Sequence, residues 1–187
     1  VGLVLSRLRE LGLEEHTIVV FTSDHGYHLG EHGLWQKMSL FEESARVPLI
    51  MAGPGVDSHA SVVRAPVGLV DLYPTLTDLC QINAPDNLQG QSLVPMLTDP
   101  QVPGRGWALT QVTRRNKTKA GGLVFGYTLR TERWRYTSWD EGKAGYEIYD
   151  HQTDPAEQDN LAGKPDFREL EASLKEQLKA AVTQSLP

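Results

Sequence analysis

The sequence has little cysteine, no long apolar run and no excess of positive charge. Among 187 residues there is one cysteine, Cys80, which excludes an intrachain disulfide and a CxxC metal site. No stretch approaches roughly 18 consecutive apolar residues, the length that a membrane-spanning helix needs. The formal net charge of −6 argues against a general nucleic-acid binder, because phosphate contacts need clustered lysine and arginine. We therefore expect neither a membrane nor a nucleic acid as a partner.

The composition that remains is that of an ordinary globular protein, with 40% hydrophobic and 22% charged residues. A chain of this length buries roughly 70% of the surface that it exposes when unfolded, so it can form a core. Its first residues carry charges at Arg7, Arg9 and Glu10 instead of the pattern of a cleavable signal. Because there is also no initiator methionine, we expect a fragment of a longer protein.

Hydrophobic spacing predicts an α/β fold. Val4 and Leu8 belong to a helical repeat that predicts an N-terminal helix ending at Gly12. The unbroken apolar runs at 18–22 and 47–53 are expected to form buried strands of a parallel sheet. Helix, strand, long loop and strand in this order are typical of α/β proteins.

A change of character follows the second apolar run. Leucines at helical spacing predict a core helix within 67–82, with Pro74 near its first turn. From 84 to 105, prolines and glycines predict an irregular connector. We therefore divide the chain into an α/β part, 1–105, and a smaller part, 106–187.

The smaller part is expected to be antiparallel. The segments 123–131, 132–139 and 146–150 are short and rich in aromatic and β-branched residues, which predicts a meander. Asp166 and Glu169 have the spacing of a capping box at the start of a C-terminal helix. Its apolar face predicts that this helix covers one side of the small sheet.

The stretch SDHGYHLGEHGLWQK, residues 23–37, carries the chemistry of the chain. It follows the first predicted strand, and ligands collect where the strands of α/β sheets end. A carboxylate beside an imidazole, Asp24 with His25, predicts half of a divalent-metal site whose other ligands come from other strands. Three glycines in the stretch would let the backbone turn tightly around a bound group.

Two other interpretations of these residues are open. Asp24 could cap the loop through its own backbone while His25 is an interior histidine with satisfied hydrogen bonds. Alternatively, the spacing of His25, His28 and His32 is that of a zinc site on a helix, although the intervening glycines disfavour a regular helix.

Lys37 is the next candidate. Most lysines are solvated surface residues, but in a site for a tetrahedral anion an ammonium group would neutralise charge on the oxygens. Glu31 and His32 either support such a site or are ordinary polar loop residues. Tyr27 and His28 are candidate substrate contacts, and packing within the loop explains them equally well.

Several segments together resemble a known family. They are SDHGYHLGEHGLWQK, ARVPLIMAGPG, VGLVDLYPTLTDLCQI, NLQGQSLVPML and YEIYDHQTDPAEQDNLA, in this order. The set resembles the type I sulfatases of the alkaline-phosphatase-like superfamily, most closely iduronate-2-sulfatase and its bacterial relatives. The resemblance spans nearly the whole chain. It implies the C-terminal portion of a sulfatase, with part of the large α/β domain followed by a small antiparallel sheet that a helix covers.

The resemblance also assigns roles. Asp24 and His25 match two calcium ligands of the family, and Lys37 matches a lysine that contacts the sulfate group. In the family, a cysteine or serine of a C/S-x-P-S-R motif becomes formylglycine, whose hydrate attacks sulfur. This chain lacks that motif and the family's Asp-Asp pair. We therefore expect one calcium ion shared with the N-terminal part of the same enzyme, formylglycine in that part, and no activity of this chain alone.

The function that the resemblance implies is hydrolysis of sulfate esters on sugars, as in the degradation of glycosaminoglycans or algal polysaccharides. The alternatives are a two-metal phosphodiesterase or phosphomutase of the same superfamily, and a noncatalytic binding module. An imidazole ligand also leaves magnesium or a transition metal open. A periplasmic, secreted or lysosomal location agrees with the family.

Overall fold

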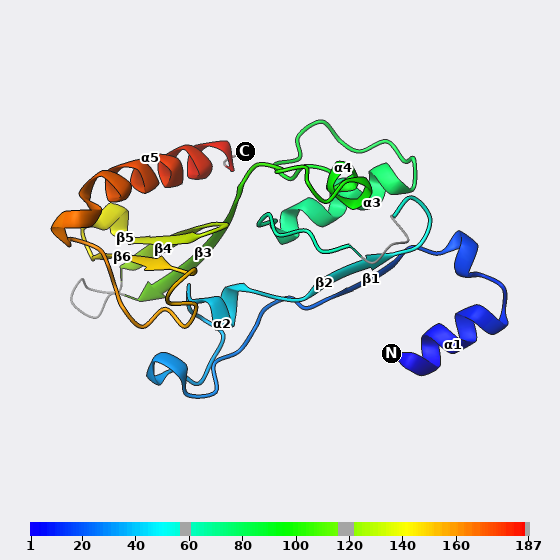
Figure 1. Ribbon diagram of the computed structural model, residues 1–187, viewed down its shortest axis with the longest axis horizontal. Helices are drawn as coiled ribbons and strands as arrows, with labels where there is room; N and C mark the ends of the chain where they lie inside the picture. The colour runs from blue at the N-terminus through cyan, green and yellow to red at the C-terminus, as the bar shows by residue number, and fades with distance from the viewer. Residues whose placement is uncertain (57–60, 116–121, 186–187) are drawn as a thin grey trace. The chain divides into compact units, whose positions relative to one another are not determined.

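The structure is a computed structural model that describes residues 1–56, 61–115 and 122–185. It contains two compact units (Figure 1). The first unit comprises 1–24, 48–64 and 69–104, and the second comprises 25–47, 65–68 and 105–187. In the described part of the chain, no helix is long and apolar enough to cross a membrane.

The described residues of the first unit form three α-helices and two strands. They are α1 (Gly2–Glu10), β1 (Val19–Thr22), β2 (Leu49–Ala52), α3 (Leu72–Leu79) and α4 (Val94–Thr98). The predicted helix end at Gly12 is confirmed, since its φ of +66° suits glycine. Pro74 lies in the first turn of α3, as expected. The connector 84–105 is less irregular than predicted, because α4 forms in it with Pro95 in its first turn, where proline is tolerated.

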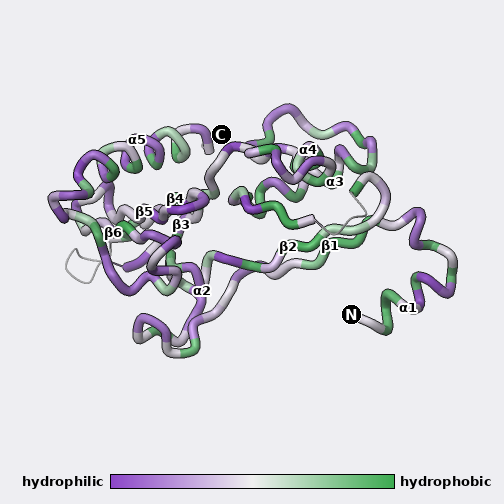
Figure 2. The backbone as a smooth tube through the Cα atoms, in the orientation of Figure 1, coloured by the Kyte–Doolittle hydropathy of each residue, from purple (hydrophilic) through white to green (hydrophobic). Residues whose placement is uncertain are grey.

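The prediction of a parallel sheet is wrong for β1 and β2. The two strands pair antiparallel, from Val19 opposite Ala52 to Thr22 opposite Leu49. Parallel neighbours need a crossover, usually a helix, whereas the segment between these strands holds only short helical turns. The two strands form a sheet of their own, and both consist mainly of hydrophobic residues (Figure 2).

The second unit is built on a four-stranded antiparallel sheet in the order β3-β4-β5-β6. Its elements are α2 (Glu42–Ala45), β3 (Trp107–Arg115), β4 (Leu123–Thr131), β5 (Trp134–Trp139), β6 (Tyr146–Asp150) and α5 (Arg168–Gln184). The predicted meander is confirmed for β4, β5 and β6. Strand β3, whose end is polar, was not predicted from the sequence.

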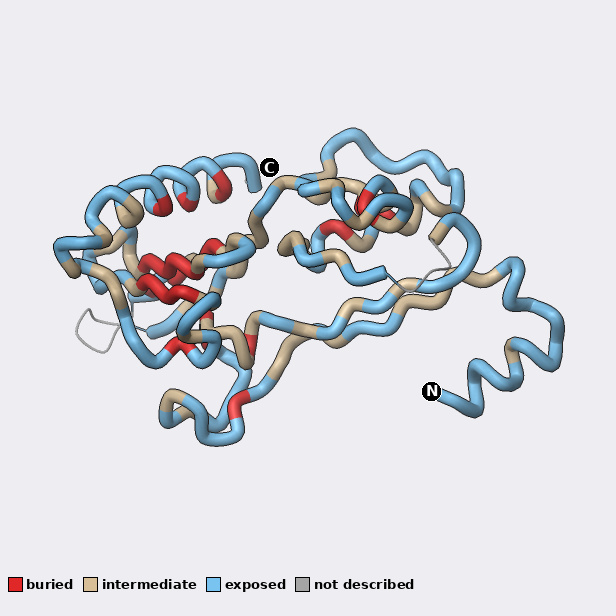
Figure 3. Tube along the Cα trace, viewed as in Figure 1, coloured by how far each residue is buried: buried red, intermediate tan, exposed pale blue. Residues whose placement is uncertain are grey.

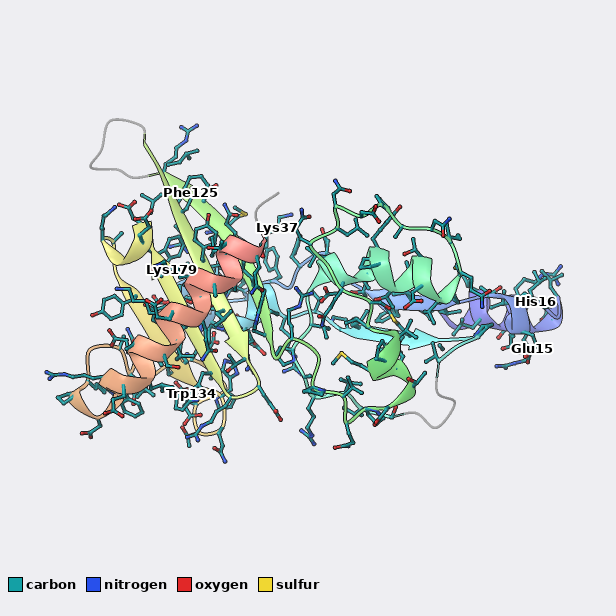
Figure 4. The ribbon with its side chains drawn as sticks, turned by 90° about the horizontal axis from the view of Figure 1, so that it is seen from above. Glu15, His16, Lys37, Phe125, Trp134 and Lys179 are labelled. Atoms are coloured by element: carbon teal, nitrogen blue, oxygen red, sulfur yellow. The ribbon has the colours of Figure 1, made fainter. Side chains whose placement is uncertain are left out.

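Helix α5 covers one face of this sheet. Leu129 of β4, Tyr136 of β5 and Ile148 of β6 lie side by side in register and pack against Leu174 and Leu178 of α5. Many buried residues of the unit lie on these strands and on the helix side that faces them (Figure 3). Seen from above, α5 lies across the strands (Figure 4). The predicted helix-covered sheet is therefore confirmed.

The start of α5 differs from the predicted capping box. Asp166 lies in a 3-10 turn, Pro165–Phe167, and α5 begins at Arg168 without a side-chain cap. The turn uses the residues that the box would need, so the helix starts later than expected.

The opposite face of the sheet is polar. Strand side chains alternate between faces, so Thr128 of β4 and Thr137 of β5 point away from α5, and the Thr137 hydroxyl donates to that of Thr128 at 2.8 Å. Arg130 and Arg135 lie on this same face as register partners. The segment 25–47, with α2, packs on this side of the sheet (Figure 1).

Candidate functional site

The predicted metal pair directly follows β1. Asp24 is exposed, and His25 is partly buried. The Nδ1 atom of His25 lies 2.7 Å from the carbonyl oxygen of Gly26. A carbonyl only accepts hydrogen bonds, so the imidazole donates here and carries its proton on Nδ1. This tautomer leaves the ring lone pair on Nε2, and metal-binding histidines commonly use a carbonyl in this way.

Gly26 lets the segment pack closely against α2. A Cβ atom at Gly26 would clash with the carbonyl oxygen of Glu43, so no other residue fits without a backbone shift. Its N–H donates to the carbonyl of Ser44 at 2.9 Å. The glycine is therefore needed for close approach between the residues after Asp24 and α2.

The candidate substrate contacts have different environments. Tyr27 is about half exposed, and its hydroxyl donates to the carbonyl of Trp35 at 3.2 Å. His28 is fully buried, with its Nε2 2.6 Å from the hydroxyl of Ser39. The backbone N–H of His28 donates to the carbonyl of Gln36 at 3.0 Å, and this bond joins the two sides of the loop. The substrate roles of Tyr27 and His28 stay predictions.

The histidines do not lie on one helix, as a helical zinc site would require. Residues 24–29 have no helical structure, and His32 has a φ of 53°, outside the range of a regular helix. The ring of His32 stacks on Phe41 with a centroid distance of 3.8 Å. The local backbone therefore excludes the helical alternative.

Lys37 combines an exposed side chain with a held backbone. The residue is exposed, whereas its carbonyl oxygen accepts two hydrogen bonds. One comes from the N–H of Ser39 at 3.0 Å, and the other comes from the hydroxyl of Ser44, a buried residue of α2. The side chain that carries the ammonium group thus extends from a backbone that two hydrogen bonds hold in place.

A cluster of charged side chains connects α2 to the polar face of the sheet. We call it the charge cluster, and its members are Glu42, Arg130, Arg135, His151 and Glu157. The Glu42 carboxylate is paired with the guanidinium groups of Arg135 and, at 3.3 Å, of Arg130. The Arg135 guanidinium also pairs with Glu157. The N–H of Glu42 donates to Glu157 at 2.8 Å, and the Nε2 of His151 lies 2.7 Å from the same carboxylate.

Burial makes these charges interdependent. Arg135 and Glu157 are each only 1% exposed. Burial raises the pKa of Glu157, but the hydrogen bond from His151, the charge of Arg135 and the hydrogen bonds from the Glu42 N–H and from Arg135 together hold this pKa below its ordinary value. Burial likewise lowers the pKa of Arg130, and the charge of Glu42 opposes this. Glu157 is therefore an ionised carboxylate that depends on its partners.

Some carboxylates and histidines in and beside this cluster lie close enough together to be considered as a metal site. Ligand atoms of Glu42, His151 and Glu157 lie within 4.8 Å of one another, and so do those of His32, Glu43 and Glu157. Both sets share Glu157, whose two oxygens already accept from Arg135, His151 and the N–H of Glu42. A cation here would face the buried guanidinium group of Arg135, so we interpret the group as an ion-pair network.

Sequence reasoning missed every member of the charge cluster. Glu42 and Glu157 are 115 positions apart, and Glu42 and Arg135 are 93 apart, so no spacing rule connects them. The available signal was weak. Arg130 and Arg135 stand where strand alternation predicts the face opposite Leu129 and Tyr136, but an arginine there usually indicates a solvated face.

The chain is similar to known proteins along nearly all of its length. Residues 30–184 match the family model described as N-sulphoglucosamine sulphohydrolase, C-terminal. Arylsulfatase K of Gallus gallus is 38% identical over 189 residues, covering 97% of this chain and 34% of that protein. The chain thus spans about a third of the length of that relative.

Two solved structures show the same fold. The structure of BT4656 in complex with its substrate D-glucosamine-2-N,6-O-disulfate has a TM-score of 0.84 and 29% identity, covering 98% of this chain and 37% of that chain. The phosphonate monoester hydrolase of Agrobacterium radiobacter has a TM-score of 0.83 and 28% identity, covering 99% of this chain and 38% of that chain.

Proposed function

Because this chain belongs to the sulfatase family, we propose that it is the C-terminal part of an enzyme that hydrolyses sulfate esters of sulfated sugars. The observation that carries the proposal concerns the segment after β1. There the backbone of Lys37 is held by hydrogen bonds, and its side chain is exposed to solvent. The likeness to a structure that contains a disulfated glucosamine supports a sugar as the substrate.

The proposed role of Lys37 is electrostatic. When the sulfate ester bond breaks, negative charge grows on the departing oxygen, and a positioned ammonium group lowers the energy of that state. The hydrogen bonds to the Lys37 carbonyl support this role, because a group that stabilises the transition state must be positioned before the reaction begins. We assign Lys37 the contact with the sulfate group.

Asp24 and His25 are the proposed metal ligands of this chain. The carboxylate of Asp24 suits calcium, and the Nδ1 proton of His25 leaves Nε2 as a donor to the metal. These groups fit a divalent cation, which when bound would orient the sulfate ester and offset its charge. The remaining ligands and the formylglycine are proposed to lie in the N-terminal part of the same enzyme.

A second candidate is hydrolysis of phosphonate or phosphate esters, because a phosphonate monoester hydrolase has the same fold over 99% of this chain. Its substrate is also a tetrahedral anion, for which an ammonium group and a metal pair are equally useful. The nucleophile that would separate the two chemistries is proposed to lie in the N-terminal part of the same enzyme. A direct comparison of substrates is therefore required.

The test uses the complete enzyme that carries this chain, assayed in parallel with a sulfated glucosamine and an aryl phosphonate monoester. We expect turnover of the sulfate ester to exceed that of the phosphonate. Lys37→Ala should lower sulfate turnover on the order of 10²- to 10³-fold. Lys143→Ala, which removes an exposed lysine of the same unit, should leave it unchanged. Faster phosphonate turnover, or an unaffected Lys37→Ala enzyme, would contradict the proposal.

A further inference from the structure

The backbone position of Lys37 depends on α2. The Ser44 hydroxyl that binds the Lys37 carbonyl belongs to this helix, and the Ser44 carbonyl accepts from Gly26. Gly26 near the start of the segment 25–37 and Lys37 at its end are therefore both hydrogen-bonded to the same buried serine, Ser44. Any movement of α2 would carry Lys37 with it.

Helix α2 cannot hold its own position. It has four residues, Glu42–Ala45, and no side-chain cap at its start. An isolated helix this short is unstable in water, because nucleation costs more than one turn of hydrogen bonds returns. Its stability must come from the groups that it contacts.

Those contacts converge on the charge cluster. The first N–H of α2, from Glu42, donates to Glu157, and the carboxylate of Glu42 binds Arg130 and Arg135. Arg130 and Arg135 are register partners on adjacent strands, β4 and β5, so the sheet places their Cα atoms opposite each other. Both the backbone and the side chain of one residue, Glu42, are thus tied to the sheet.

From this connection we propose that Glu42, Arg135 and Glu157 are positioning residues for Lys37, which they hold in place by anchoring α2 to the C-terminal sheet. The inference rests on the proposed function of Lys37 for its effect on turnover, while the anchoring itself is a statement about the fold. It gives the small antiparallel sheet an indirect role in the reaction.

Charged groups suit this role better than an apolar contact. Apolar side chains can slide over one another, whereas a guanidinium group presents its donors in a fixed planar fork. Because Arg135 binds Glu42 and Glu157 at once, and Glu157 also binds the N–H of Glu42, the three residues form a closed set of contacts. A closed set restrains rotation of α2 as well as its distance from the sheet.

The effect on catalysis follows from the sensitivity of positioned groups. A displacement of about 1 Å can cost on the order of 10²-fold in rate. Since Lys37 is proposed to contact the sulfate group and to act mainly on charge that develops in the transition state, its misplacement should lower kcat by a larger factor than it raises KM. Glu42→Gln retains the size of the side chain while removing its charge, so it weakens the anchor without opening a cavity.

The experiment measures kcat and KM of the complete enzyme with Glu42→Gln, Arg135→Lys and Leu174→Ala. We expect kcat to fall about 10- to 100-fold in the first two variants, because a lysine lacks the fork of Arg135. Leu174→Ala is the matched control, since it weakens the same unit from the α5 face and leaves α2 untouched. An equal fall of kcat in Leu174→Ala would show a general stability effect and overturn the inference.

Hydrogen exchange supplies a readout that does not need activity. The N–H groups of Gly26, His28 and Gly30 donate to carbonyls of Ser44, Gln36 and Leu34. In Glu42→Gln these amides should exchange at least about 10-fold faster, while the amides of β4 and β5 keep their protection. Unchanged exchange at all three would refute the anchoring. If exchange changes but the unaltered enzyme hydrolyses no sulfate ester, the anchoring stands and the proposed function fails.

Discussion

Replacing Arg135 by methionine tests whether the charge cluster stabilises the second unit. The guanidinium group is 1% exposed and lies between the carboxylates of Glu42 and Glu157. Methionine has a similar length without the charge, so the variant leaves two acidic groups facing each other on the polar side of the sheet. Removing one partner of a buried pair commonly costs about 3 to 5 kcal/mol.

The expected cost lies at the lower end of this range, because each carboxylate keeps other partners. Glu157 retains His151 and the N–H of Glu42, and Glu42 retains Arg130. A loss of about 3 kcal/mol corresponds to roughly a 150-fold increase in the equilibrium constant for local opening. Because the pair is buried, added salt should change the result little.

Hydrogen exchange of the β5 and β6 amides in the complete enzyme measures this opening. The control is Lys143→Met, which removes an exposed ion pair with Glu141 in the same unit and should hardly affect exchange. The pKa of Glu157 is depressed in the fold, so its contribution is fully present above the ordinary value of 4.5 and is lost as the pH falls through the folded-state pKa. The difference between Arg135→Met and the unaltered enzyme should therefore narrow below pH 4.5. Equal opening in the two variants at neutral pH would refute the role of the cluster.

Three further outcomes are expected. Burial, followed by the charge of Glu157, raises the pKa of Glu147, so the stability of the protein falls as the pH rises through this pKa. Glu147→Gln should therefore raise the free energy of unfolding at neutral pH but not below pH 4.5. Denaturant titrations at both pH values measure this difference. Gly26→Ala should lower turnover about 10²-fold by displacing α2, whereas Gly2→Ala, where a Cβ meets nothing within 4 Å, should not; equal rates would contradict the close packing. Calorimetry should find calcium bound at least about 10²-fold more weakly by this chain alone than by the complete enzyme, and Asp24→Asn should weaken both; equal affinities would contradict a shared site.

The sequence predicted only those residues of the candidate site whose chemistry and local position are informative by themselves. Asp24, His25 and Lys37 were identified from their residue types, their place after a strand and their resemblance to the sulfatases, and the family is confirmed. Their roles as metal ligands and sulfate contact stay predictions, as does the division of the chain at residue 105. The support beneath Lys37 was not recoverable, since Ser44 and Glu42 carry no recognisable motif.

The same contrast runs through the fold. The aromatic and β-branched residues of the β4, β5 and β6 segments predicted the meander, and the helical repeat of α5 predicted that this helix covers one side of the small sheet, because each pattern depends on residues that are neighbours in the chain. The direction of β1 relative to β2 was predicted wrongly, because apolar runs are the same in parallel and antiparallel pairs and the path of the connection decides between them.

By itself, the sequence determined helices α1, α3 and α5, most of the strands, the family and the position of the proposed site after β1. Only the tertiary structure decided that a glutamate of α2 meets an arginine of β5 and a glutamate beyond β6. Ion pairs between distant segments have no periodicity in the chain. They exist because the folded sheet brings those side chains together away from water, where each charge needs the others.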